Sequence, residues 1–211
     1  MKNVLLGFLF GFLILASACA PAEQAAEEAT AEATEEEATT EEAEPTVVAS
    51  TESYTTVVLE DGIASPRKEM KGAIGDAEIT VGYGSPSVKG REIWGGLNPF
   101  DKLWRTGANG ATTIEFSQDV TIEGQPLAAG KYSVFSIPTA ESVTIIFNTD
   151  TDQRGTSSYD EAKDALRVTV APQPQEASQE AMEFMIEGDQ VVLSWDTWKV
   201  PFTVAAASTE G

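Results

Sequence analysis

Residues 182–204 read MEFMIEGDQVVLSWDTWKVPFTV, and this stretch decides the fold class. It contains three short runs rich in β-branched and aromatic residues, Met182–Ile186, Val191–Trp195 and Trp198–Val204. The segment Glu187-Gly188-Asp189 separates the first two runs, and Gly and Asp in such a cluster are typical of a turn. The pattern predicts consecutive β-strands.

The same kind of run recurs towards the N-terminus. Further strands are predicted at Ala77–Tyr83, Thr112–Phe116, Lys131–Ile137, Val143–Phe147 and Leu166–Val170. Only Tyr159–Ala165 has a helical pattern, and it is brief. The series predicts an all-β fold, an antiparallel β-sandwich that is jelly-roll-like rather than a barrel.

The first residues have the features of a secretory signal. A basic start at Lys2 is followed by an apolar run, Val4–Ala16, and then by small residues up to Cys19. The apolar run is too short to span a bilayer, which takes roughly 20 residues. Residues 1–18 are therefore predicted to be a signal peptide that is removed.

The residues around the cleavage point indicate the kind of signal. Leu15-Ala16-Ser17-Ala18-Cys19 resembles the lipobox of bacterial lipoproteins, in which the cysteine receives a diacylglycerol group, and Cys19 is the single cysteine of the chain. The resemblance implies an exported protein of the bacterial cell envelope, anchored in the outer membrane in a species that has one. The alternative is an ordinary secretory signal with an incidental cysteine.

A long acidic segment follows the predicted lipidation site. Residues 19–46 consist mainly of Ala, Glu and Thr, with ten glutamates and no Lys or Arg. Few apolar side chains and unbalanced charge favour disorder, so this segment is predicted to be a flexible tether. Residues 47–211 then form one domain of ordinary size.

Composition excludes several kinds of chemistry. The chain has no histidine, and its one thiol lies at the predicted anchor, which removes Ser-His-Asp and Cys-His catalysis as well as His- or Cys-ligated zinc. We expect neither a cofactor nor a metal site. Asn148, Asp150 and Asp152 alternate as at the start of a calcium loop, but the positions that should be Gly and Glu are Gln153 and Tyr159, so a polar turn is predicted.

Charge narrows the choice of partners. Without the signal and the tether, the chain has 24 acidic and 12 basic residues. Nucleic acid is therefore not an expected partner, because binding to phosphates requires a basic face.

Several blocks of the domain resemble a known family. They are Ala64–Arg67, Tyr83–Arg91, Ile93–Leu97, Leu103–Asn109 and Ala129–Pro138. Together they resemble the family catalogued as domain of unknown function 2911, over roughly Ser65 to Val204. The resemblance implies no activity, substrate or catalytic residue.

One segment, between Tyr83 and Asn109, concentrates side chains suited to binding. Tryptophan can stack on a sugar ring, and arginine can hold a carboxylate through two hydrogen bonds. The candidate binding surface comprises Lys89, Arg91, Trp94, Trp104, Arg105 and Asn109. The alternative is structural: the tryptophans close the end of the sandwich, the arginines pair with acidic neighbours, and Arg105 in particular is buried and paired.

Two functions remain open. The first is a non-catalytic envelope module that binds a carbohydrate, a peptide or an envelope protein. The second is a hydrolase that works through two carboxylates, such as a glycosidase, which needs facing carboxyl groups roughly 5 to 9.5 Å apart. The candidate blocks contain few acids, which favours binding.

Overall fold

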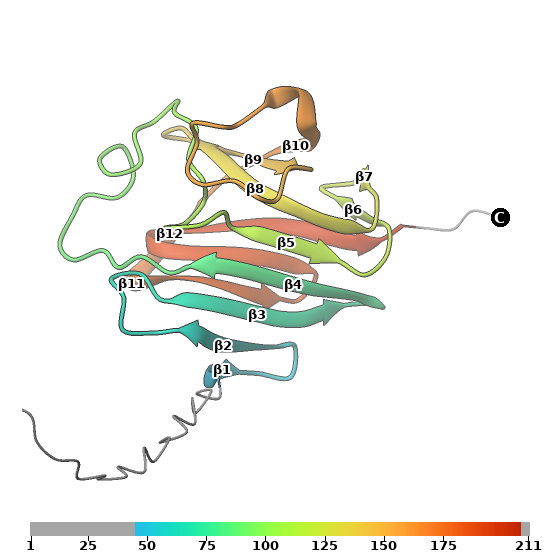
Figure 1. Ribbon diagram of the computed structural model, residues 1–211, viewed down its shortest axis with the longest axis horizontal. Coiled ribbons are helices and arrows are strands. Elements are labelled where there is room, and N and C mark those ends of the chain that lie inside the picture. The colour runs from blue at the N-terminus through green and yellow to red at the C-terminus, as the bar shows by residue number, and fades with distance from the viewer. Residues whose placement is uncertain (1–44, 208–211) are drawn as a thin grey trace, which may run out of the picture. The chain divides into compact units, whose positions relative to one another are not determined.

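Two antiparallel sheets pack face to face in the computed structural model, which describes residues 45–207 (Figure 1). The predicted signal peptide, Cys19 and residues 20–44 of the predicted tether lie outside the described residues. No helix within residues 45–207 has the length and apolarity needed to cross a bilayer.

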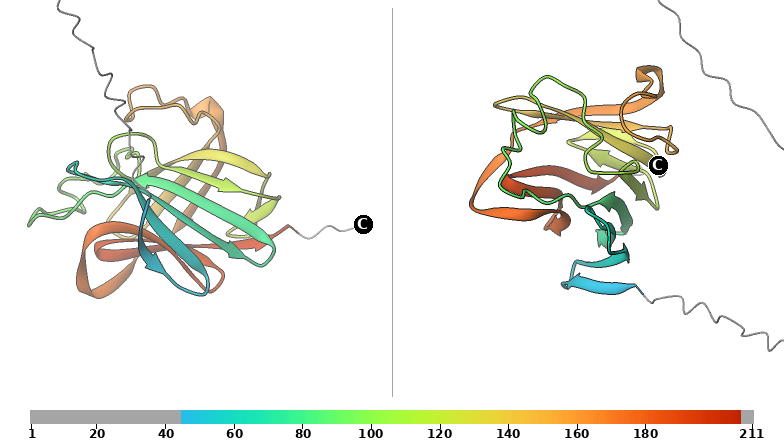
Figure 2. Two further views of the ribbon diagram at one scale, coloured as in Figure 1. Left: turned by 60° about the horizontal axis from the view of Figure 1, so that its bottom comes forward. Right: turned by 60° about the vertical axis from the view of Figure 1, so that its left-hand side comes forward.

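The larger sheet has eight strands. In spatial order they are β1 (Thr46–Ser50), β2 (Tyr54–Glu60), β3 (Arg67–Ile74), β4 (Ala77–Gly84), β5 (Thr113–Phe116), β8 (Gly130–Pro138), β9 (Val143–Asn148) and β10 (Asp164–Val170). The smaller sheet has four, in the order β11 (Gln173–Glu187), β12 (Gln190–Ala206), β6 (Val120–Ile122) and β7 (Gln125–Leu127). Figure 2 shows the two layers from two further directions.

The core lies between the sheets because each strand sends alternate side chains to that side. On β4, Ile79, Val81 and Tyr83 are fully buried, and on β12 Val191 and Trp195 are as well. These side chains and their neighbours form one continuous apolar cluster. The all-β antiparallel sandwich expected from the sequence is confirmed.

The connectivity differs from a jelly roll. From β1 to β5, and again from β8 to β10, strands that follow one another in the chain are neighbours in the sheet. This is a meander, in which each strand pairs with the next one in the chain, rather than a chain that alternates between two sheets. The long β11–β12 hairpin supplies most of the second layer.

Two local expectations are also wrong. The runs Val191–Trp195 and Trp198–Val204 belong to one strand, β12, which continues past Asp196 although that residue has a φ of 51° and the register with β11 shifts beside it. In place of the predicted helix, the structure has one 3-10 turn, η1 (Glu161–Lys163), capped by the Asp160 side chain.

The sequence patterns also missed β3, which begins with Arg67-Lys-Glu-Met-Lys71. A lysine occupies one of its core-facing positions, so no apolar alternation is visible.

Lys68 is 9% exposed and forms an ion pair with Glu183 of β11, while Tyr83 of β4 donates a hydrogen bond of 2.7 Å to the other oxygen of the same carboxylate. Burial, reinforced by the nearby Glu183 charge, raises the pKa of Tyr83 well above its ordinary value, so its hydroxyl stays a donor. This cluster links the two sheets.

Candidate functional site

The loop between β4 and β5, residues 85–112, closes one end of the sandwich and is bonded to both sheets (Figure 1). Val88 N–H donates to the carbonyl of Glu180 on β11 at 2.8 Å. Trp104 exchanges two backbone hydrogen bonds of 2.8 Å with Ser136 on β8. These bonds fix the loop in place, so the side chains that it carries are held in a defined arrangement.

Gly84 allows the loop to return close to the sheet. A Cβ at this position would lie 2.2 Å from the carbonyl oxygen of Ala108, far inside contact distance. The Ala108 N–H also donates to the Gly84 carbonyl at 3.3 Å. The segment that carries Arg105 and Asn109 therefore sits where it does because residue 84 has no side chain.

The loop also holds backbone strain. Six non-glycine residues among those described have a positive φ, and four of them belong to this loop: Lys89, Asp101, Thr106 and Asn109. Each such conformation costs on the order of 1 kcal/mol or more and persists where the surrounding structure imposes it. Strain of this kind clusters at functional sites.

All four tryptophans of the chain meet beneath this loop. Trp94 stacks on Trp198 with ring centroids 4.5 Å apart, and Trp104 stacks on Trp195 at 5.7 Å. Trp94 also contacts Trp104 edge to face at 5.8 Å and donates its indole N–H to the carbonyl of Trp195 at 3.4 Å. The cluster anchors the loop on β12, which agrees with the alternative prediction that the tryptophans close the end of the sandwich.

A pocket of about 440 Å³ opens beside this cluster, and we call it the loop pocket. Its lining includes Arg91, Asn98, Trp104, Arg105, Asn109 and Trp195. No aspartate or glutamate contributes to the lining. The pocket thus combines an aromatic wall with two guanidinium groups and no carboxylate.

Three residues that line the loop pocket each carry a buried hydrogen-bond donor without an acceptor. Asn98 Nδ2, Arg105 Nε and Trp195 Nε1 are buried and have no hydrogen-bond partner among the described residues. Asn98 is 4% exposed and Trp195 is 1% exposed. An unsatisfied buried donor costs about 1–3 kcal/mol, so a ligand that offers acceptors here would gain affinity.

The arginines of the loop pocket do not form the pairs that the structural alternative required. Arg105 is half-buried and makes no ion pair or hydrogen bond with any described residue. Arg91 is exposed and donates its Nε to the Val88 carbonyl at 3.0 Å, and its Nη2 to the Ser87 carbonyl, so its partners are backbone oxygens. The expectation that Arg105 is buried and paired is therefore wrong: Arg105 is half-buried, and no aspartate or glutamate lines the loop pocket.

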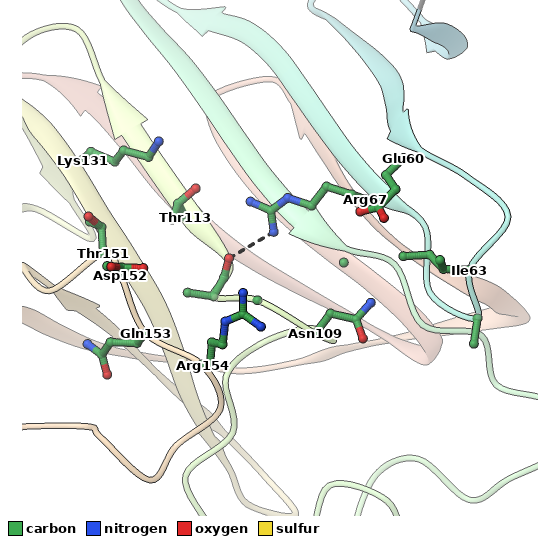
Figure 3. Close-up of a pocket in the computed structure, with 14 residues that line it drawn as sticks. Glu60, Ile63, Arg67, Asn109, Thr113, Lys131, Thr151, Asp152, Gln153 and Arg154 are labelled. Atoms are coloured by element: carbon green, nitrogen blue, oxygen red, sulfur yellow. Dashed lines mark hydrogen bonds between the residues drawn. The ribbon is translucent and has the colours of Figure 1, made fainter. Parts of the chain in front are cut away.

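A second pocket, of about 900 Å³, lies on the outer face of the larger sheet, and we call it the sheet pocket (Figure 3). It is lined by Arg67, Lys131 and Arg154 among others, and by two acids, Glu60 and Asp152. In Figure 3 these two acids lie on opposite sides of the opening with the arginines between them.

Arg67 spans the floor of the sheet pocket. It lies over Gly82 and donates to the carbonyl of Ala111 at 3.1 Å. Burial lowers the pKa of Arg67 from its ordinary value because desolvation disfavours the cation, while the charges of Glu69 and Glu60 act in the opposite direction. Arg67 stays charged, because arginine is not deprotonated in proteins.

The two pockets adjoin, because Asn109 lines both. Its Nδ2 donates to the Ser65 carbonyl at 3.1 Å, which holds the side chain between them. The remaining candidate residues behave differently: Trp94 is buried in the tryptophan cluster, and Lys89 is exposed but lines neither pocket. Of the candidate surface, the structure brings together Arg91, Trp104, Arg105 and Asn109.

Charge is distributed unevenly over the described residues. Five of the twelve basic side chains form ion pairs: Lys68, Lys71, Lys163, Arg167 and Lys199. The other seven have no ion pair within the part of the chain that the structure describes, and five of these line the two pockets: Arg67, Arg91, Arg105, Lys131 and Arg154. The remaining two are Lys89 and Lys102. Unpaired positive charge therefore gathers at one region of an acidic domain.

The polar turn predicted near Asn148 is organised by side-chain hydrogen bonds. Asn148 Oδ1 accepts from the Asp150 N–H at 3.0 Å and from Gln153 Nε2 at 3.1 Å. A hydrogen bond from Lys163 holds the pKa of Asp150 below its usual range. This turn forms one wall of the sheet pocket through Gln153 and Arg154.

Sequence reasoning missed Asn98, Trp195 and the basic residues of the sheet pocket. A signal for some of them was nevertheless present. Each of the five blocks on which the family resemblance rests contributes at least one residue to the lining of a pocket, for example Arg67, Gly84 and Lys131. Nothing in the local sequence marks Asn98 or Arg154.

Fold and site together define a small β-sandwich domain with a donor-rich, aromatic-walled pocket at one end. The chain belongs to the family described as Protein of unknown function (DUF2911), whose model matches residues 65–204. Comparison with curated proteins found no match, and neither did comparison with solved structures.

Proposed function

We propose that this protein is a non-catalytic binding module of the bacterial cell envelope, anchored through Cys19, that takes an anionic ligand in the loop pocket. The observation that carries the proposal is a pocket whose lining includes Arg91, Asn98, Arg105 and Trp195, with a buried unpaired donor on each of the last three and no carboxylate. Each of these groups is a hydrogen-bond donor, so the complementary ligand is an acceptor.

The domain's charge balance strengthens this inference. Acidic residues outnumber basic ones 24 to 12 outside the tether and signal, so acidic partners are abundant. Arg91 and Arg105 nevertheless stay unpaired among the described residues. A guanidinium presents a fixed fork of donors that matches a carboxylate or phosphate. The Arg105 fork makes no hydrogen bond with the described residues, whereas Arg91 has Nη1 left beside the two nitrogens that donate to backbone carbonyls.

A hydrolase that uses two carboxylates finds less support. The lining of the loop pocket contains no acid, and the two acids of the sheet pocket are separated by arginines in Figure 3. We therefore keep the binding role as the proposed function.

The first test is Arg105→Ala in the full-length protein. Because no buried carboxylate is left behind and a buried unpaired Nε is removed, we expect the free energy of unfolding to change by less than about 0.5 kcal/mol, or to rise slightly. Arg105→Ala should no longer bind the anionic ligand of the loop pocket. Thermal melts with a panel of carboxylated sugars and acidic dipeptides would measure both properties, since a ligand of the folded state raises the melting temperature.

Lys102→Ala is the matched control for Arg105→Ala, because it removes one unpaired positive charge of the same loop outside both pockets. It should bind like the wild type. If Arg105→Ala instead binds every stabilising anion as tightly as Lys102→Ala does, or if no anion in the panel stabilises the wild type, the loop pocket is not an anion site.

The anchor is tested separately with Cys19→Ser. The only thiol of the chain would be lost, so we expect export to continue while metabolic labelling with palmitate and retention in the membrane fraction disappear. A labelled, membrane-bound variant would rule out Cys19 as the site of lipidation.

A further inference from the structure

The sheet pocket, like the loop pocket, is lined by basic side chains without an ion pair, and it also contains Glu60 and Asp152. Arg67, Lys131 and Arg154 line it and have no ion pair among residues 45–207. It also contains the remaining unsatisfied group: Gln153, 4% exposed, has a buried Oε1 without a hydrogen-bond partner. All four such atoms among the described residues thus belong to residues that line one of these two adjoining pockets.

The two pockets adjoin at Asn109 and its neighbours. Gly107 and Ala108 line the loop pocket, whereas Gly110 and Ala111 line the sheet pocket. Residues this small leave room for a ligand to pass from one pocket to the other across Asn109, whose side chain is exposed. In Figure 3 the guanidinium groups of Arg67 and Arg154 point towards the same part of the sheet pocket.

We propose that the sheet pocket is a second anionic subsite of the same ligand, and that this ligand is an acidic oligosaccharide whose chain crosses Asn109. The inference rests on the proposed function, because the loop pocket supplies the first subsite. Positive groups in two adjoining pockets fit a chain with a carboxylate on each of several sugars.

The lining favours a saccharide over an acidic peptide. Trp104 offers the loop pocket an aromatic face on which a sugar ring can stack, and sugar hydroxyls both donate and accept hydrogen bonds. The sheet pocket matches hydroxyls with Asn109, Thr113 and Gln153 and includes one large apolar side chain, Ile63.

Calorimetric titration of the full-length protein with galacturonate and with its linear hexamer tests the inference. We expect the hexamer to bind roughly tenfold or more tightly than the monomer, since filling the second subsite becomes intramolecular. Lys131→Ala/Arg154→Ala should reduce hexamer affinity to that of the monomer and leave monomer affinity unchanged. Both side chains are exposed and make no hydrogen bond with the described residues, so folding should be preserved.

Lys89→Ala/Lys102→Ala is the matched control, because it removes two positive charges outside both pockets. It should keep the hexamer advantage. If Lys131→Ala/Arg154→Ala keeps that advantage while Arg91→Ala/Arg105→Ala loses monomer and hexamer alike, the second subsite is wrong and the proposed function stands. If the wild type binds neither saccharide nor any other small anion, the proposed function fails. Hexaglutamate binding as tightly as the hexamer would overturn the saccharide assignment.

Discussion

Glu183→Ala should destabilise the domain by about 3 kcal/mol, the lower end of the range for breaking a buried ion pair, because the Glu183 side chain retains 22% exposure. The change leaves Lys68 buried without its counter-charge and deprives the Tyr83 hydroxyl of its acceptor. Because these groups belong to β3, β4 and β11, the loss falls on the contact between the two sheets. In a domain of this size the melting temperature should fall by on the order of 10 °C, measurable by thermal and urea denaturation.

Glu187→Ala is the matched control for Glu183→Ala. It makes the same substitution on the same strand, but its ion pair with Lys199 is exposed, so the cost should stay below about 1 kcal/mol. The double variant Lys68→Met/Glu183→Met should recover most of the loss, since replacing a whole buried pair by apolar side chains is often neutral. Equal unfolding free energies for Glu183→Ala and Glu187→Ala would show that the inter-sheet pair contributes nothing.

Trp195→Ala should have the second large effect, a loss of about 3–5 kcal/mol. Trp195 is 1% exposed and contacts Trp104 and Trp94 with its ring. Its removal opens a cavity under the β4–β5 loop and takes away aromatic contacts worth about 0.5–1.5 kcal/mol each. Urea denaturation of the full-length protein would measure the loss.

Thr197→Ala serves as the control for Trp195→Ala, since Thr197 is exposed on the same strand and should be nearly neutral. Trp195 also lines the loop pocket, so ligand binding by the variant should weaken even under conditions where it is fully folded. A Trp195→Ala protein as stable as Thr197→Ala would mean that the tryptophan cluster does not anchor the loop.

The net negative charge of the domain is compatible with the proposed anion site. The ion pairs of the described residues involve Lys68, Lys71, Lys163, Arg167 and Lys199, none of which lines either of the two pockets. At physiological ionic strength, exposed charges further apart than about 8 Å are largely screened from each other. Local unpaired arginines can therefore attract a carboxylate despite the net negative charge.

The fold class and most strands with a plain alternation could be predicted from the amino-acid sequence alone. Ala77–Gly84, Val143–Asn148 and Val191–Trp195 place apolar side chains at every second position, because one face of each strand packs in the core. The dense Trp and Arg block was also visible, and four of its six candidate residues line the loop pocket.

The other features depend on contacts between residues far apart in the chain, so local patterns could not predict them. β3 was hidden since its core-facing Lys68 finds its carboxylate on β11, 115 residues away. The jelly-roll expectation was wrong because strand order depends on which strands pair, and alternation is the same in a meander. The surroundings of Arg67, Arg105 and Arg154 could not be predicted either. Packing between distant elements sets whether an arginine contacts a carboxylate or an open pocket. Here that packing leaves all three without an ion pair among the described residues.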